Sequence, residues 1–124
     1  MVIELPWPPS VNHYWRRQGN RYFVSSEGKA YKDSVYYLCS QYRGLFKPYE
    51  RLSLLIEAYP PDKRRRDLDN LIKAIQDSLQ YAGVYDDDSQ IDCLTIKRNV
   101  LREKKVIVQI SVLQNGIKSS SKSL

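Results

Sequence analysis

Cysteine and histidine are nearly absent from this sequence, which has two cysteines and one histidine in 124 residues. Cys39 and Cys93 stand far apart, and neither belongs to a CxxC pair or lies near a histidine. This spacing argues against a zinc site or a disulfide framework, and we interpret both residues as buried, reduced thiols. His13 stands alone in a polar segment, where it could be a general base but is more typical of a surface residue.

Long hydrophobic runs are also missing. No apolar run approaches the roughly 20 residues of a membrane helix, and the N-terminus lacks the pattern of a signal peptide. We therefore expect a cytoplasmic protein with no membrane association. A chain of 124 residues is most simply one domain.

Acidic residues are fewer than basic residues in this sequence. The sequence has 20 Lys and Arg against 14 Asp and Glu, which gives a net charge of +6 and a pI of about 9.3. This balance favours an anionic partner, most simply nucleic acid, although a basic pI alone fits many proteins.

The stretch 63–73 (KRRRDLDNLIK) joins a cationic run directly to two carboxylates and a helix. Carboxylates beside a basic patch weaken binding to a polyanion, so a module that only held nucleic acid would bind better without them. A metal-dependent phosphodiesterase needs both basic and acidic side chains. Basic side chains hold the phosphates, while Asp oxygens suit a hard divalent cation such as Mg²⁺.

The local spacing supports a site. Asp67 and Asp69 are two residues apart, so they leave the same face of an extended chain. We expect a helix to begin near Asp69 and to stop at Gly83, with apolar residues on one stripe. Lys73 lies one turn beyond Asp69 and off that stripe, so it can reach whatever the carboxylates hold.

A structural interpretation of the same residues stays open. Asp67 and Asp69 could cap the helix, Lys73 could be a surface residue in an ion pair with a residue four positions away, and the Arg run could be a solvated face. A D-x-D pattern by itself is a weak signal for a metal site.

The remaining pattern predicts an α/β fold: a small single domain with a mixed sheet and two main helices. We expect the first helix to run from about Ser26 to Tyr42, and we expect 91–100 and 105–112 to form a hairpin. The predicted strands are 2–5, 21–24, 52–59, 91–100 and 105–112. Residues 114–124 are polar and rich in Ser and Lys, which predicts a disordered tail.

A second acidic cluster, Asp86 to Asp88, follows the predicted helix. It fails the calcium-loop pattern, because Ile91 and Lys97 stand where Gly and Glu are required. Asp88 could share a metal with Asp67 and Asp69 only if the chain runs back toward the helix start. That requires Asp88 to lie next to the strand at 52–59.

Residues 10–17 interleave aromatic and basic side chains. Rings can stack on unpaired bases while guanidinium groups pair with phosphates. A packed loop with a solvated basic edge explains this segment equally well.

Four motifs in this order resemble the RusA family of Holliday junction resolvases. They are residues 5–12 (LPWPPSVN), 26–31 (SEGKAY), 64–71 (RRRDLDNL), and Ala82-Gly83-Val84 followed by 87–90 (DDSQ). The resemblance extends to about residue 113, which sets an endonuclease domain at 1–113. Lys63 stands where Arg is usual and Tyr85 where Trp is usual, which bears on the details of junction contact and not on the chemistry.

The resemblance implies a symmetric homodimer that uses Mg²⁺, which Mn²⁺ can replace, to cut four-way DNA junctions by paired nicks in recombination and repair. It assigns Asp67, Asp69 and Asp88 as the metal-binding catalytic carboxylates and Lys73 as the essential basic residue, which would stabilise charge on the phosphate or position the attacking water. The reaction we expect is in-line hydrolysis of a backbone phosphodiester. The residues expected to hold DNA phosphates are Arg16, Arg17, Lys63, Arg64, Arg65 and Arg66.

Two other functions remain open on the sequence. A non-catalytic DNA-binding protein would use its acidic residues only as caps and turns. A nucleotide-sugar transferase also carries a D-x-D motif, but this chain is short and an Arg run precedes the motif.

Overall fold

The sheet is organised around β4 (Leu52–Tyr59), the strand that the sequence marks most clearly. Leu52, Leu54, Ile56 and Ala58 alternate along it and are fully buried. This period of two places one side of the strand in the core, as its apolar residues predict. A computed structural model of the chain describes residues 1–113, so the tail predicted at 114–124 lies outside the described residues.

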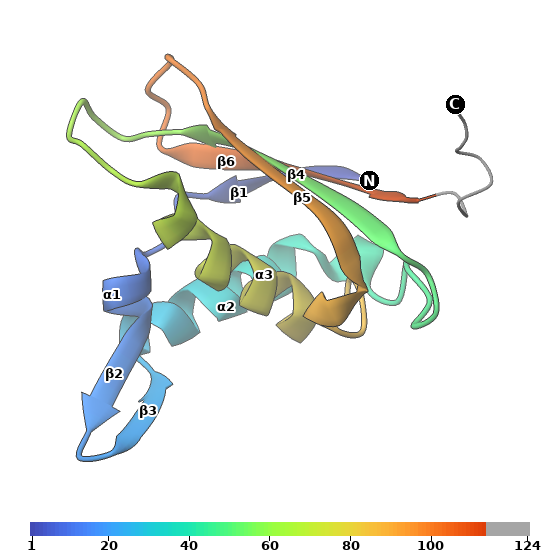
Figure 1. Cartoon of the computed structure of the whole chain (residues 1–124), viewed down its shortest axis with the longest axis horizontal. Helices are drawn as coiled ribbons and strands as arrows, with labels where there is room; N and C mark the ends of the chain where they lie inside the picture. The colour runs from blue at the N-terminus through green and yellow to red at the C-terminus, as the bar shows by residue number, and fades with distance from the viewer. Residues whose placement is uncertain (114–124) are drawn as a thin grey trace.

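The four-stranded sheet has the order β1-β6-β4-β5 (Figure 1). The edge strands are β1 (Val2–Pro6) and β5 (Ile91–Arg98), and β6 (Lys105–Val112) lies inside. The β6 strand pairs antiparallel with β1 and β4, whereas β5 pairs parallel with β4. The sheet is therefore mixed, as expected.

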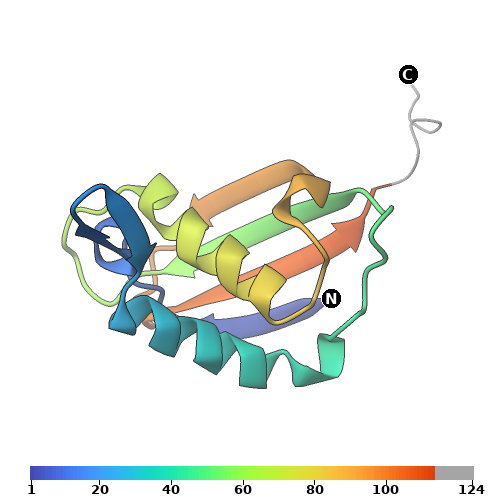
Figure 2. The same ribbon diagram turned by 90° about the horizontal axis from the view of Figure 1, so that it is seen from below.

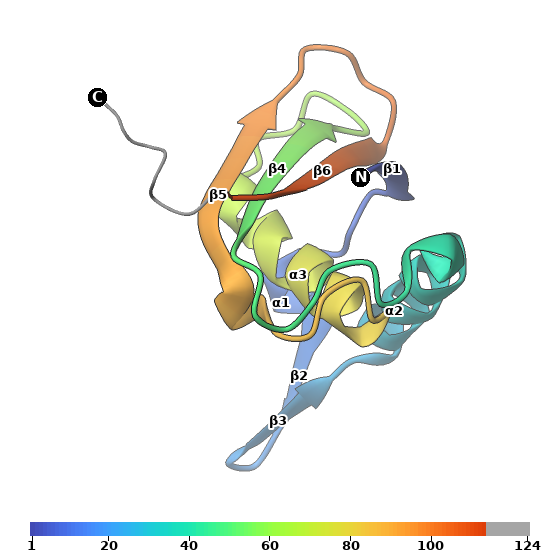
Figure 3. The same cartoon turned by 90° about the vertical axis from the view of Figure 1, so that its right-hand side faces the viewer.

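Two long helices cover one face of this sheet (Figures 1 and 3). The first is α2 (Ser26–Leu38), followed by a 3₁₀ turn, η1 (Ser40–Tyr42). The second is α3 (Ile72–Tyr81), preceded by the 3₁₀ turn η2 (Leu68–Leu71). Leu71, Ile75 and Leu79 of the predicted stripe are buried, and Gly83, with φ of 77°, ends the helix as predicted.

A two-stranded ribbon extends from the helical side of the molecule (Figures 1 and 3). It consists of β2 (Trp15–Gln18) and β3 (Arg21–Val24), joined by a tight turn at Gly19 and preceded by the short helix α1 (Val11–Tyr14). The sequence predicted the strand at 21–24, but not α1 or the partner strand β2.

The predicted hairpin of β5 and β6 is wrong. Among the described residues these strands do not pair with each other, because β4 lies between them. The chain after β5 crosses the end of β4 and returns on its other side (Figure 3), and Figure 2 shows β4 between β5 and β6. Burial explains the order: Val106, Val108 and Ile110 of β6 are buried, whereas most of β5 is exposed and suits an edge.

The two cysteines differ in environment. Cys39 is buried at the end of α2, as predicted, but Cys93 on the edge strand β5 is exposed, so its predicted burial is wrong. Within residues 1–113, no helix has both the length and the hydrophobicity needed to cross a membrane.

Candidate active site

Asp67 and Asp69 lie at η2, where the chain leaves the loop after β4 and enters α3. Asp67 is extended (φ −86°, ψ 133°) and occupies the N-cap position, but its side chain makes no capping hydrogen bond. Asp69 lies in the first turn, and both residues are exposed. The capping interpretation of Asp67 therefore has no hydrogen bond to support it.

Lys73 is fixed by a residue that the sequence analysis did not select. Its Nζ donates to Oδ1 of Asp77 at 3.0 Å, one turn further along α3, and lies 5.5 Å from the centre of the Trp15 ring. Asp77 Oδ2 accepts a hydrogen bond of 3.0 Å from the hydroxyl of buried Tyr14 on α1. Lys73 thus pairs forward with Asp77 instead of backward with Asp69.

Asp88 lies beside the second half of α3. The hydroxyl of Tyr85 is 2.7 Å from Asp88 Oδ1 and 2.9 Å from the carbonyl oxygen of Gln76. The backbone amide of Asp88 donates to Oε1 of Gln80 at 2.9 Å. The acidic turn is therefore tied to the helix at both the side chain and the backbone of Asp88.

The three aspartates of the acidic turn have different environments. The carboxylate of Asp87 accepts a hydrogen bond from the amide of Ser89 and caps η3 (Asp88–Gln90), which lowers its pKa. Asp86 is exposed. Burial, followed by the nearby charge of Asp77, raises the pKa of Asp88, although the hydrogen bond from Tyr85 opposes the shift. Of the three, Asp88 is the one whose carboxylate faces α3.

The parallel pairing of β4 and β5 separates Asp88 from Asp67 and Asp69. Leu52 at the start of β4 pairs with Ile91 at the start of β5, so Asp88 lies near the beginning of both strands. Asp67 and Asp69 follow the other end of β4. The 10 residues of α3, about 15 Å at 1.5 Å per residue, extend from one end toward the other.

Asp88 thus lies near the start of the strand at 52–59, which is the position that a shared metal site was expected to need. The start of α3 lies at the opposite end of that strand, so within one chain Asp88 is not beside Asp67 and Asp69. The end of β5 reaches the start of α3 instead, where Arg98 donates to the carbonyl oxygen of Arg66. Within residues 1–113, no three Asp, Glu, His or Cys side chains gather closely enough to hold a metal ion. The donor chemistry at η2 still fits Mg²⁺, which is commonly bound by one or two carboxylates together with substrate phosphates.

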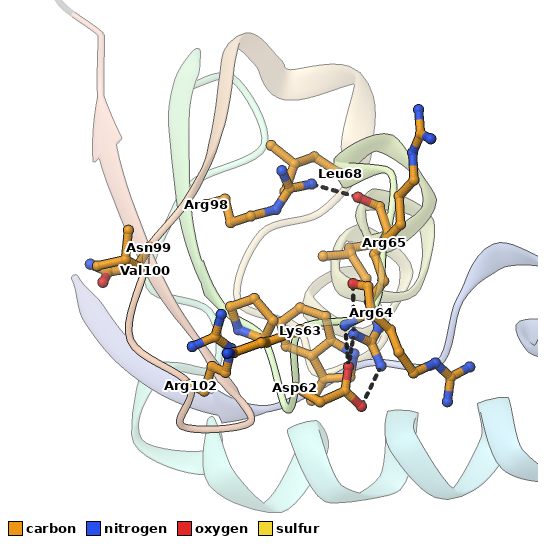
Figure 4. A pocket seen from close by; sticks show the side chains of 13 residues that line it. Asp62, Lys63, Arg64, Arg65, Leu68, Arg98, Asn99, Val100 and Arg102 are labelled. Carbon is orange, nitrogen blue, oxygen red and sulfur yellow. Dashed lines mark hydrogen bonds and ion pairs between the residues drawn. The ribbon is translucent and has the colours of Figure 1, made fainter.

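The basic run 63–66 forms one wall of a cleft of about 500 Å³ (Figure 4). The opposite wall comes from the end of β5 and the following loop, including Arg98 and Arg102, and Trp7, Leu68 and Leu71 contribute apolar surface. A neighbouring hollow shares Arg65, Arg66 and Leu71 with this cleft and also includes Asp67. The basic cleft is therefore continuous with the surface that carries Asp67.

Arg16 and Arg17 lie apart from that cleft, on the exposed ribbon. Arg17 donates to the carbonyl oxygen of Gly19 at 2.8 Å and lies 5.7 Å from the centre of the Tyr22 ring. Both arginines line a hollow with Trp15 and Tyr22, so cations and rings are interleaved as the sequence predicts. His13 is exposed, in agreement with its interpretation as a surface residue.

Sequence reasoning missed Asp77, Arg98 and Arg102. The position of Asp77 four residues after Lys73 was an available signal, since such pairs meet on a helix. Arg98 and Arg102 belong to a visibly basic segment at 97–105, but their place in the cleft depends on the parallel pairing of β5 with β4.

Basic side chains line two walls of the cleft and carboxylates lie at one end of it, an arrangement that is typical of a protein that binds a polyanion. Comparison with known proteins gives the class: the model of the family described as endodeoxyribonuclease RusA matches residues 6–111. The chain belongs to this family and is an endodeoxyribonuclease.

Similar proteins are found in phages and bacteria. The crossover junction endodeoxyribonuclease of Enterobacteria phage HK97 is 43% identical over 96 residues, which cover 77% of this chain and 80% of that protein. The enzyme of the same description from Escherichia coli K12 is 41% identical over 117 residues, covering 91% and 95%. The one from Enterobacteria phage 82 is 40% identical over the same shares.

Proposed function

We propose that this endodeoxyribonuclease is a Mg²⁺-dependent, structure-selective enzyme that resolves four-way (Holliday) DNA junctions by paired symmetric nicks, in recombination and repair. The observation that carries the proposal is the continuity between the basic cleft and the exposed, uncapped Asp67 at η2. The names of the relatives, which describe crossover junction endodeoxyribonucleases, support the choice of substrate.

Each predicted residue has a role in this proposal. Asp67 and Asp69 would hold Mg²⁺, for which Mn²⁺ can substitute, together with a phosphate oxygen of the DNA. The ion would supply an activated water and stabilise the charge that develops on the phosphate. Lys73 would hold its positive charge beside the reacting phosphate, because Asp77 and Trp15 fix its position. The residues that would bind other phosphates are Arg16, Arg17, Lys63, Arg64, Arg65 and Arg66.

The proposed homodimer would explain how Asp88 can act together with Asp67 and Asp69. One chain holds Asp67 and Asp69 at one end of α3 and Asp88 beside its second half. Two chains related by a two-fold axis can bring Asp88 of one to the aspartate pair of the other, twice over. Two equivalent sites also suit symmetric nicks in two strands.

The test is incubation of the purified protein with a labelled four-way junction and with a linear duplex of matching sequence, in Mg²⁺ or in EDTA. We expect symmetric nicks in the junction alone, only with the metal, and none from the Asp69→Asn variant. The variant should still bind the junction, because removing a negative charge does not weaken contact with DNA. Nicks in EDTA, equal cutting of the duplex, or loss of binding in a folded variant would overturn the proposal.

The alternatives left open by the sequence now have less support. Membership of an endodeoxyribonuclease family argues against a non-catalytic DNA-binding module and against a nucleotide-sugar transferase. The ion pair of Lys73 with Asp77 and the cap formed by Asp87 do match the structural roles that a DNA-binding module would give these residues, but the family assignment decides in favour of an enzyme.

A further inference from the structure

The cleft lined by 63–66 and by Arg98 and Arg102 joins segments that are distant in the sequence. They meet because β4 and β5 are parallel neighbours: Ala58 near the end of β4 pairs with Arg98 at the end of β5. The loops after these two strands therefore leave the sheet at the same edge and face each other. Figure 4 shows Arg98 reaching from β5 toward the opposite wall.

The wall formed by residues 63–66 is held in place by an ion pair with Asp62, whose carboxylate also lines the cleft. Asp62 bonds both terminal nitrogens of Arg66, and its Oδ1 also accepts from the amide of Arg64. Arg66 is further held by Arg98, which donates to its carbonyl oxygen, and by the Trp7 ring, 5.9 Å away. Arg66 is thus part of the framework of the cleft.

The other basic groups of the cleft are not neutralised. Within residues 1–113, Lys63, Arg64, Arg65 and Arg102 form no ion pair with a carboxylate, and Asp62 is the only acid in the lining. Arg98 uses one terminal nitrogen on the Arg66 carbonyl, and its charge remains. The cleft therefore has a strong excess of positive charge, together with an apolar floor, by which we mean the surface that Trp7, Leu68 and Leu71 contribute.

This combination fits one strand of a nucleic acid. Phosphates suit the guanidinium and ammonium groups of the walls, and the apolar edges of sugars suit the floor. A volume of about 500 Å³ is in the range of sites that hold one small ligand, of roughly 300 to 1,000 Å³. The cleft therefore has room for a short piece of one strand.

We propose that this cleft is a subsite for the phosphodiester backbone of the DNA strand that is cut, next to the scissile phosphate, and that Arg98 and Arg102 each contact one phosphate there. The inference rests on the proposed function, because the strand leads from the cleft to Asp67 through the hollow that shares Arg65 and Arg66. It adds Arg98 and Arg102 to the groups that hold the substrate.

The test compares two variants of equal charge. Arg98→Gln with Arg102→Gln removes two cations from the cleft. Lys97→Gln with Lys104→Gln removes two cations from the same part of the chain, but neither lysine lines the cleft. Binding of a labelled four-way junction is measured in EDTA at several salt concentrations, and nicking is measured separately in Mg²⁺.

We expect the cleft variant to bind about tenfold or more weakly near physiological salt. Its dependence of log K on log salt should be shallower by roughly 1.4 to 1.8, the value for two lost phosphate contacts. The control should keep the wild-type slope. The single variant Arg102→Gln removes an exposed side chain with no described hydrogen bond. Its slope should change by about half as much as that of the double variant. It serves as a control in case the double variant misfolds.

Ethylation of individual phosphates locates the contact. Modified phosphates adjacent to the nick should interfere with binding by the wild type and not by the cleft variant. Equal behaviour of the cleft and control variants, or an unchanged slope in Arg102→Gln, would overturn the subsite. Absence of Mg²⁺-dependent nicking by the wild type would overturn the proposed function instead, and the two failures are therefore distinguishable.

Discussion

The ammonium group of Lys73 lies 3.0 Å from Oδ1 of Asp77, one turn further along α3. Because Tyr14 holds the other oxygen of Asp77, the position of Lys73 depends on a contact between α1 and α3. The side chain of Lys73 is therefore fixed by contacts from two elements.

Replacement of Asp77 should impair cutting more than binding. In Asp77→Asn the amide can still accept from Tyr14, but the charged partner of Lys73 is lost. Misplacement of a reacting group by a small distance costs up to about 100-fold, and we expect kcat to fall about 10- to 100-fold with little change in junction affinity. Single-turnover nicking and gel-shift binding measure the two effects.

The matched control for Asp77 is Asp33→Asn, which removes an equal charge from an exposed position on α2. It should leave both quantities unchanged. Partial recovery in Asp77→Glu, which restores the charge, would separate positioning from a loss of stability. An unchanged nicking rate in Asp77→Asn would show that Lys73 needs no partner.

The shared site of the proposed homodimer can be tested by mixing inactive variants. Asp69→Asn and Asp88→Asn should each be inactive alone. In a heterodimer of the two, one site carries both substitutions and the other carries neither, so co-refolding should restore nicking, in one strand per junction. A mixture that contains heterodimers and does not nick would place all three carboxylates of each site in one chain.

The ion pair of Asp62 and Arg66 should persist in moderately acidic solution. The hydrogen bond from Arg66, followed by that from the Arg64 amide, lowers the pKa of Asp62 from 3.8 to about 2. A lowered pKa in the folded state means that the pair stabilises the fold above pH 3.8, and that this stabilisation is lost as the pH falls through about 2. NMR titration of the Asp62 carboxyl should give the low pKa in the wild type and a higher pKa in Arg66→Gln, still below 3.8 because the hydrogen bond from the Arg64 amide remains. Equal values would exclude the pair in solution.

The two thiols should react at very different rates. Burial raises the pKa of Cys39 to about 11, and its side chain is inaccessible, whereas Cys93 is exposed. At pH 8 a thiol reagent should therefore modify one cysteine in the native protein and two in denaturant. Cys93→Ser should remove the fast reaction. Rapid modification of Cys39 in that variant would contradict its burial.

Gly28 should not tolerate even alanine. A Cβ atom there would lie 2.7 Å from Cγ1 of Val24 and 2.9 Å from the carbonyl oxygen of Tyr14. Alanine is the better helix former, yet overpacking of this kind typically costs about 1 to 3 kcal/mol. Denaturant unfolding of Gly28→Ala should show this loss, and Ser34→Ala on the exposed face of α2 should not. Stability equal to that of the wild type would mean that α1 can move away from α2 without cost.

Local patterns predicted the elements whose structure depends on local physics. The strand at 52–59 and the apolar stripe of α3 follow from hydrophobic periodicity, and Gly83 ends the helix because its positive φ suits glycine. These features could be read from neighbouring residues.

Pairing between distant segments could not be predicted in the same way. Proximity in sequence favoured a hairpin of β5 and β6, but burial of Val106, Val108 and Ile110 places β6 beside β4. The predicted hairpin also left Arg98 outside the site, because it hid the parallel pairing of β5 with β4. The direction of pairing decides which end of a strand reaches a site, and the side-chain pattern of the single strand at 91–98 did not reveal that direction.

The loop that crosses the end of β4, between β5 and β6, has a consequence for how this enzyme can vary. Both walls of the basic cleft are loops that leave one edge of the sheet, while the register of β4 with its neighbours is set by buried residues further along the strands. Insertions or deletions in either loop can therefore deepen or narrow the cleft without disturbing the core. In the proposed subsite, loop length alone would then change the contact with the DNA strand.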